Sequence, residues 1–219
     1  MIRLAISSTR LRSTVAALAA GSLAVAGLLI AAPAANAAPA DTTLDASYPV
    51  SGTTAIKATN STMNLGPGTL DAVLDLDTNG ISANLSLPPA TGSFTELGFL
   101  PVTATTEFIQ DGPTTGTEDP NTGGIASSSK IIIRLTDVKI AGIDVPVGNS
   151  CQTSPATVNL TSQADFNVVT GGTVSGTYTI PSFSNCGLIN TPIINAVIPG
   201  SGNTITLTLG TPTVTVPNS

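Results

Sequence analysis

The sequence feature that most constrains the fold is the alternation of side chains between Leu65 and Pro88. Every second residue is apolar along two segments, 70–76 and 81–87, and mostly polar residues stand between them. A period of two is typical of a β-strand with one buried face and one face in water. The residues between the segments, Asp77–Gly80, are common turn formers. The stretch therefore predicts a β-hairpin.

The turn of this hairpin has two similar sequences further along the chain. Asn121–Ile125 and Val169–Thr173 occur in similar settings. Gly80, Gly124 and Gly172 are separated by 124 − 80 = 44 and 172 − 124 = 48 residues. We interpret the three sequences as one recurring turn.

Alternation also occurs elsewhere, so the sequence predicts about ten strands. The clearest of them are expected at 47–58, 70–76, 81–87, 102–108, 130–135, 158–160, 174–180 and 204–209. Between them, Asp111–Gly124 has almost no apolar residue and is expected to be the longest and most mobile loop. Segment 138–147 is broken by Gly and Pro, which favours an edge strand or a bent strand.

One segment has helical spacing. Thr191 is the expected cap and Pro192 the expected first helical residue. Four apolar residues of the segment share one face, namely Ile193, Ile194, Val197 and Ile198. We interpret this helix as a plug at one end of the core, with a hydrophobic lip on a ligand cavity as the alternative.

Composition indicates an all-β fold. Hydrophobic residues make up 41% of the chain but aromatic residues only 3%, so Val, Ile, Leu and Ala must form the core. Charged residues make up only 9%, so Thr, Ser and Asn must cover the solvent faces, and Thr suits strands. We predict an antiparallel two-sheet sandwich or a barrel-like closure, with one short C-terminal helix. The alternation does not separate the two architectures.

The first 37 residues have the order of a secretory signal peptide. Three arginines precede an uncharged apolar stretch, 15–32, and the small residues Ala35-Asn36-Ala37 follow. This order predicts cleavage between Ala37 and Ala38 and a single secreted β-domain, 38–219, with no membrane span after cleavage. A membrane anchor is the alternative, and Pro33 disfavours it.

Charge and cysteines restrict the partners and the compartment. The chain has 7 basic and 13 acidic residues, and loss of the three leading arginines gives 4 − 13 = −9. A negative surface argues against nucleic acid and anionic membranes as partners. Cys151 and Cys186 are the only two cysteines, and in an exported chain they are expected to form a disulfide.

The sequence offers little for catalysis. It has no His, which removes the commonest general base and every His-dependent triad. Glu96 and Glu107 lie near phenylalanines, and two carboxylates can hydrolyse a glycoside. We interpret both as solvated strand residues and predict no catalytic residue.

The hairpin turn also resembles part of a calcium loop. Asp75, Asp77, Asn79 and Gly80 match the first half of that motif. Position twelve is Ser86, where a bidentate Glu is required. We interpret the segment as a turn and predict no metal site and no cofactor.

Six short stretches resemble a family of uncharacterised secreted proteins of actinobacteria. They are Leu65-Gly66-Pro67-Gly68-Thr69-Leu70, Leu87-Pro88-Pro89-Ala90-Thr91-Gly92, Pro101-Val102-Thr103-Ala104-Thr105, Val145-Pro146-Val147-Gly148, Tyr178-Thr179-Ile180-Pro181 and Asn203-Thr204-Ile205-Thr206-Leu207. The resemblance covers most of 38–219. It implies export and a β-fold, and it implies no activity.

These observations predict a secreted, non-catalytic β-domain of the extracellular space or cell envelope. It acts by binding a partner there or as a structural surface module. The alternatives are a carboxylate-dependent hydrolase and a carrier of a small hydrophobic ligand. The partner site is expected at Asp111–Gly124, and a hydrophobic ligand is expected beside Leu188–Ile198. An apolar cavity at the second place would favour lipid, and two facing acids would favour an enzyme.

Overall fold

The structure is a computed structural model that describes residues 42–216. The described residues belong to one compact unit. The expected signal peptide and its cleavage point, Ala37–Ala38, lie outside the described residues.

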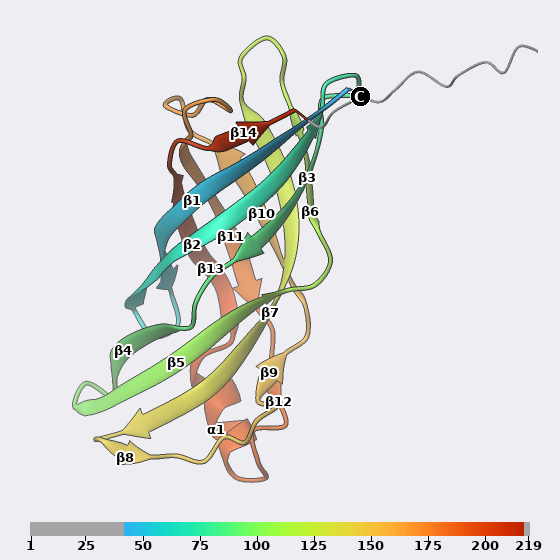
Figure 1. The fold of residues 1–219 in the computed structure, drawn as a ribbon. Helices are drawn as coiled ribbons and strands as arrows, with labels where there is room; N and C mark the ends of the chain where they lie inside the picture. Colours follow the sequence, from blue (N-terminus) through green and yellow to red (C-terminus); the bar gives the residue numbers. More distant parts are fainter. Residues whose placement is uncertain (1–41, 217–219) are drawn as a thin grey trace, which may run out of the picture. The chain divides into compact units, whose positions relative to one another are not determined.

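The described residues form an all-β fold with one short helix (Figure 1). The strands are β1 (Thr43–Ile56), β2 (Ser61–Asp75), β3 (Gly80–Ser86), β4 (Ala90–Glu96), β5 (Leu100–Gln110), β6 (Thr114–Glu118), β7 (Ile125–Ile140), β8 (Ile143–Asp144), β9 (Gln152–Thr153), β10 (Ala156–Ser162), β11 (Gly172–Ile180), β12 (Phe183–Ser184), β13 (Gly200–Leu209) and β14 (Thr213–Thr215). The helix is α1 (Asn190–Val197).

Eight of the strands close into a barrel. Their order is β1-β2-β3-β6-β7-β10-β11-β13, and β13 pairs with β1 to complete the circle. Every one of these pairs is antiparallel. Of the two architectures that the sequence left open, the barrel-like closure is therefore the one that forms.

The same sheet continues outside the barrel from the long strand β7 through two further strands. The first half of β7 lies between β6 and β10, and its second half pairs with β5, which pairs with β4 (Figure 1). A β-bulge at Thr136 interrupts the register between β7 and β5, because Asp137 pairs with Thr105 whereas Leu135 pairs with Thr106. Strand β7 thus contains the predicted strand 130–135 and the first residues of the predicted bent segment 138–147, with the bulge between them.

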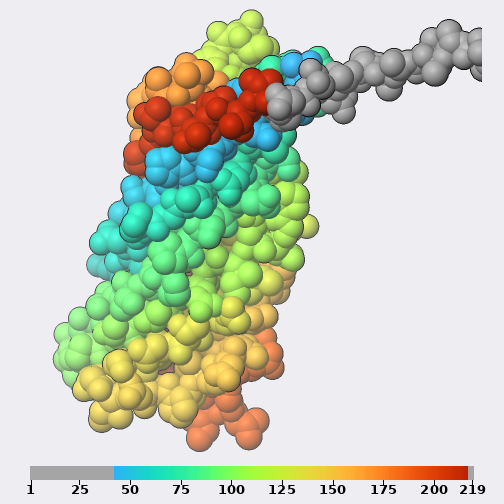
Figure 2. Space-filling model, viewed as in Figure 1, coloured from blue at the N-terminus to red at the C-terminus, as the bar shows by residue number. Residues whose placement is uncertain are grey.

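The predicted hairpin 65–88 is confirmed. Leu70 pairs with Leu85 and Leu74 pairs with Ile81, and these residues face the barrel interior. The turns after β2, β6 and β10, at 76–79, 119–124 and 163–171, all lie at one end of the barrel (Figure 1 and Figure 2). We call this end the acidic end, because Asp75, Asp77, Glu118, Asp119 and Asp165 lie there.

The expectation that Asp111–Gly124 is one long loop was wrong. Its middle part is strand β6, which closes the barrel between β3 and β7. Thr114 is buried inside the barrel, and Gly116 packs closely against the backbone of Ala126. Small and hydroxyl-bearing residues suffice here because the strand is held by backbone pairing on both sides.

The helix lies where the sequence predicts it, but its expected cap was wrong. The residue at the N-cap position is Ile189, and its side chain makes no capping hydrogen bond. The Thr191 hydroxyl instead donates to the carbonyl oxygen of Gly187 at 2.7 Å and accepts from the Cys186 N–H at 3.1 Å. Thr191 therefore ties the first turn of the helix to the segment before it.

Candidate ligand-binding groove

The two carboxylates considered for catalysis are far apart. Glu107 on β5 pairs with Arg134 on β7, with a Glu107 Oε2 to Arg134 Nη2 distance of 2.6 Å. Glu96 lies opposite Leu100, at the far end of the β4–β5 hairpin. Seven positions along β5 separate Leu100 from Glu107, which corresponds to roughly 20 Å. The structure does not bring these carboxylates together.

Asp75, at the start of the hairpin turn, is engaged by the turn itself, whereas Asp77 accepts a hydrogen bond from the Thr42 N–H at 3.2 Å. Asp75 Oδ1 accepts hydrogen bonds from the backbone N–H groups of Asp77 at 2.9 Å and Thr78 at 3.0 Å. The bond to the Thr78 side chain, followed by these backbone bonds, lowers the pKa of Asp75. Between residues 42 and 216, no group of three or more potential metal-ligating side chains occurs.

The barrel interior is nearly filled by side chains. A cavity of about 90 Å³ remains there, lined almost wholly by apolar residues. This is smaller than the cavity of about 150 Å³ that holds benzene in another protein. Ser129 on β7 is buried in the lining, and its hydroxyl has no hydrogen-bond partner. The cavity is also smaller than an ordinary small-molecule pocket, which measures roughly 300–1,000 Å³.

A larger apolar space lies outside the barrel, between α1 and strands β4, β5 and β7. Its volume is about 340 Å³, within the range of small-molecule pockets, roughly 300–1,000 Å³. All of its lining residues but one are apolar. They are Phe94, Glu96, Leu97, Leu100, Val102, Ala104, Leu135, Val138, Ile140, Ile193, Ile194, Val197 and Ile198. We call this space the α1 groove.

Local sequence patterns explain both walls of the α1 groove. On β5, Val102 and Ala104 are two residues apart and therefore face the same side. On the helix, Ile194 and Ile198 are four residues apart and lie on one face. Glu96 supplies the only charged group of the lining, and it lies at the end of β4 next to the turn.

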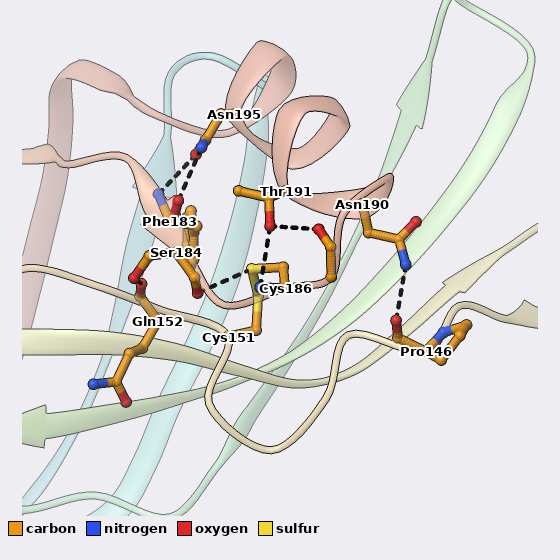
Figure 3. Close-up of a disulfide and its surroundings, with 10 residues drawn as sticks. Pro146, Cys151, Gln152, Phe183, Ser184, Cys186, Asn190, Thr191 and Asn195 are labelled. Atoms are coloured by element: carbon orange, nitrogen blue, oxygen red, sulfur yellow. Dashed lines mark hydrogen bonds between the residues drawn. A yellow bond between two sulfur atoms is a disulfide. The ribbon is translucent and has the colours of Figure 1, made fainter.

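The helix is held by polar contacts, and a disulfide lies close to its first turn (Figure 3). Cys151 and Cys186 form a disulfide, which confirms the pairing that the two cysteines predict. The Asn195 side chain accepts from the Phe183 N–H at 2.7 Å and donates to the Phe183 carbonyl oxygen at 2.9 Å. Asn190 Nδ2 donates to the carbonyl oxygen of Pro146 at 2.8 Å. An isolated eight-residue helix is unstable in water, so these contacts fix it over the groove.

Sequence reasoning identified one wall of the groove and missed the other. The helix was considered as a hydrophobic lip, and the structure places its apolar face in the groove. The residues of β4, β5 and β7 in the lining were not recognised as part of a site. Their signal was the turn Leu97–Phe99, where two large apolar residues, Leu97 and Phe99, occupy positions that are usually polar.

The fold and the groove define an all-β protein with an eight-stranded antiparallel barrel and an apolar groove beneath a C-terminal helix. Comparison of the chain with protein-family models, with curated proteins and with solved structures finds no match. Within the part of the chain that the structure describes, no helix has the length and apolar character needed to cross a bilayer.

Proposed function

We propose that this protein is a secreted, non-catalytic binding protein and that its ligand is a small hydrophobic molecule with an alkyl chain. The observation that carries the proposal is the α1 groove, whose lining contains a single charged residue. Apolar ligands are bound mainly by removal of their surface from water, which needs such a lining. The disulfide is consistent with an oxidising environment, and the signal-peptide pattern of residues 1–37 supports export.

Glu96 restricts the ligand further. It is the one charged residue in an otherwise apolar lining, so an anionic headgroup placed beside it would be repelled. We therefore expect alcohols, esters or other uncharged amphiphiles to bind better than free fatty acids. Substitution Glu96→Gln should reduce this difference.

A chain-length series tests whether burial of hydrocarbon drives binding. Each buried methylene contributes about 0.8 kcal/mol, which is about fourfold in affinity. The affinity of 1-alkanols, measured by displacement of a fluorescent alkyl probe, should rise by about this factor per methylene and level off once the groove is full. Affinity that does not depend on chain length would contradict the proposal.

Two glutamine variants on the helix locate the site. Val197 lines the α1 groove, whereas its neighbour Ala196 is exposed and lies outside the lining. Val197→Gln should weaken alkanol binding at least about tenfold, since it places an amide among apolar groups. Ala196→Gln should bind normally. Equal affinity in the two variants, or hydrolysis of a bound alkyl ester, would overturn the proposal.

A further inference from the structure

We propose that the end of the protein opposite the acidic end docks on a lipid surface with neutral headgroups. Three segments would enter that surface: Leu97–Phe99 in the β4–β5 turn, Ala141–Ile143 in the β7–β8 turn, and Leu188–Ile189 before α1. We call them the apolar tips. The inference goes beyond ligand binding, because it rests mainly on residues outside the lining of the α1 groove.

The five most exposed large apolar side chains among the described residues lie in the apolar tips, whereas those at or near the acidic end are 41–69% exposed. Leu97 is 76% exposed, Phe99 74%, Ile143 72%, Leu188 99% and Ile189 74%. Single exposed apolar residues are ordinary on protein surfaces, but a group of them at one end marks an interaction site.

Contacts between the segments keep the apolar tips at the same end. The Ala141 N–H donates to the carbonyl oxygen of Pro101 at 2.8 Å, which holds the β7–β8 turn beside the β4–β5 hairpin. Leu97 and the helix residue Ile193 line the same groove. Figure 2 shows the segment before α1, in orange, projecting at the lower end, with the yellow β8 region at the lower left and the green β4–β5 turn just above that region.

Two of the tips are sharp turns with apolar residues in a strained conformation. Leu97 has φ of 53° and is followed by Gly98 at 78°, and Ala141 has φ of 50° and is followed by Gly142 at 79°. Turns with two successive residues at positive φ favour Asn or Asp before Gly. An exposed Leu in this conformation adds nothing to the core, so its presence favours a role at the surface.

The charge distribution indicates the kind of surface. At the acidic end five carboxylates gather, and none of the four Lys and Arg residues between 42 and 216 lies in its turns. Near the tips, Lys139 lies between Asp137, at 3.7 Å, and Asp144, to which it donates a hydrogen bond. The tips therefore bring no excess positive charge to attract anionic headgroups. Zwitterionic or uncharged headgroups fit this end, and the acidic end then points to water.

Vesicle flotation tests the proposal with the secreted protein. We expect binding to phosphatidylcholine vesicles, weaker binding when phosphatidylglycerol replaces part of the lipid, and little dependence of phosphatidylcholine binding on salt. Phe99→Ser and Leu188→Ser should each lower the partition coefficient about tenfold or more, because each removes a buried apolar side chain from the lipid-bound state.

Matched controls separate this idea from its alternatives. Val169 is 61% exposed at the acidic end, so Val169→Ser should leave vesicle binding unchanged. Val197→Gln, which changes the α1 groove and not the apolar tips, should also float with vesicles. A defect in alkanol binding can therefore be distinguished from a defect in docking on the lipid surface. No flotation of the wild-type protein, stronger binding to anionic vesicles, or a stable dimer in solution that Phe99→Ser dissociates would overturn the proposal.

Discussion

Removal of the disulfide should cost a large part of the folding free energy. The bond closes a loop of 186 − 151 + 1 = 36 residues. In the chain-entropy model a loop of this length restricts the unfolded state by about 4 kcal/mol. Small domains have about 5–15 kcal/mol in total, so the double variant Cys151→Ala/Cys186→Ala should fold but unfold at much lower urea concentration.

The position of the disulfide predicts a second, local effect. Cys186 precedes α1 by four residues, and both cysteines are fully buried beside the segment that supports the helix. The double variant should therefore bind alkanols more weakly under conditions where the barrel strands remain folded. Barrel content is followed by far-ultraviolet circular dichroism, and groove binding by the alkyl probe.

Urea unfolding of the double variant provides the measurement of the first effect. The free energy of unfolding should fall by about 4 kcal/mol with little change in slope, and Ser150→Ala, next to the disulfide, serves as the control. A loss below about 1 kcal/mol would refute the entropic reasoning. Unchanged alkanol affinity in the folded double variant would refute the role of the disulfide in holding α1.

Three further results are expected. Ser129→Ala should raise the free energy of unfolding by about 1 kcal/mol, because it removes a buried hydroxyl without a partner; a decrease in urea unfolding would contradict this. Burial raises the pKa of Tyr48 and Tyr178, so the tyrosinate absorbance of the folded protein should appear only above about pH 10. The stability linked to these phenols is present below that pH and is lost as pH rises through the raised pKa values. Titration of both phenols at the ordinary tyrosine pKa would contradict this. Melting curves recorded with calcium and with a chelator should coincide. A calcium-dependent rise of several degrees in the melting temperature that disappears in Asp77→Ala would contradict this.

The local elements were predictable because period-two alternation reports the faces of a strand directly. The hairpin of β2 and β3 follows from its own sequence, including the turn. Closure of the barrel does not, because β1 pairs with β13 through contacts such as Thr54 with Ile205, about 150 residues apart. Strand β6 was missed because its inward positions, Thr114 and Gly116, are not apolar, and its place is fixed by neighbours on both sides.

The groove was only half predictable, and strand β7 shows why. Its first half directs Ser127 and Ser129 into the barrel, while Leu135, Val138 and Ile140 line the α1 groove. Before the bulge at Thr136 the buried side chains are at odd positions, and after it they are at even positions. The period-two pattern is therefore interrupted in the sequence although the strand continues. Alternation identifies the buried face of each half but not the compartment that the face lines. That compartment is decided by β5 and α1, which pack against β7 from distant parts of the sequence.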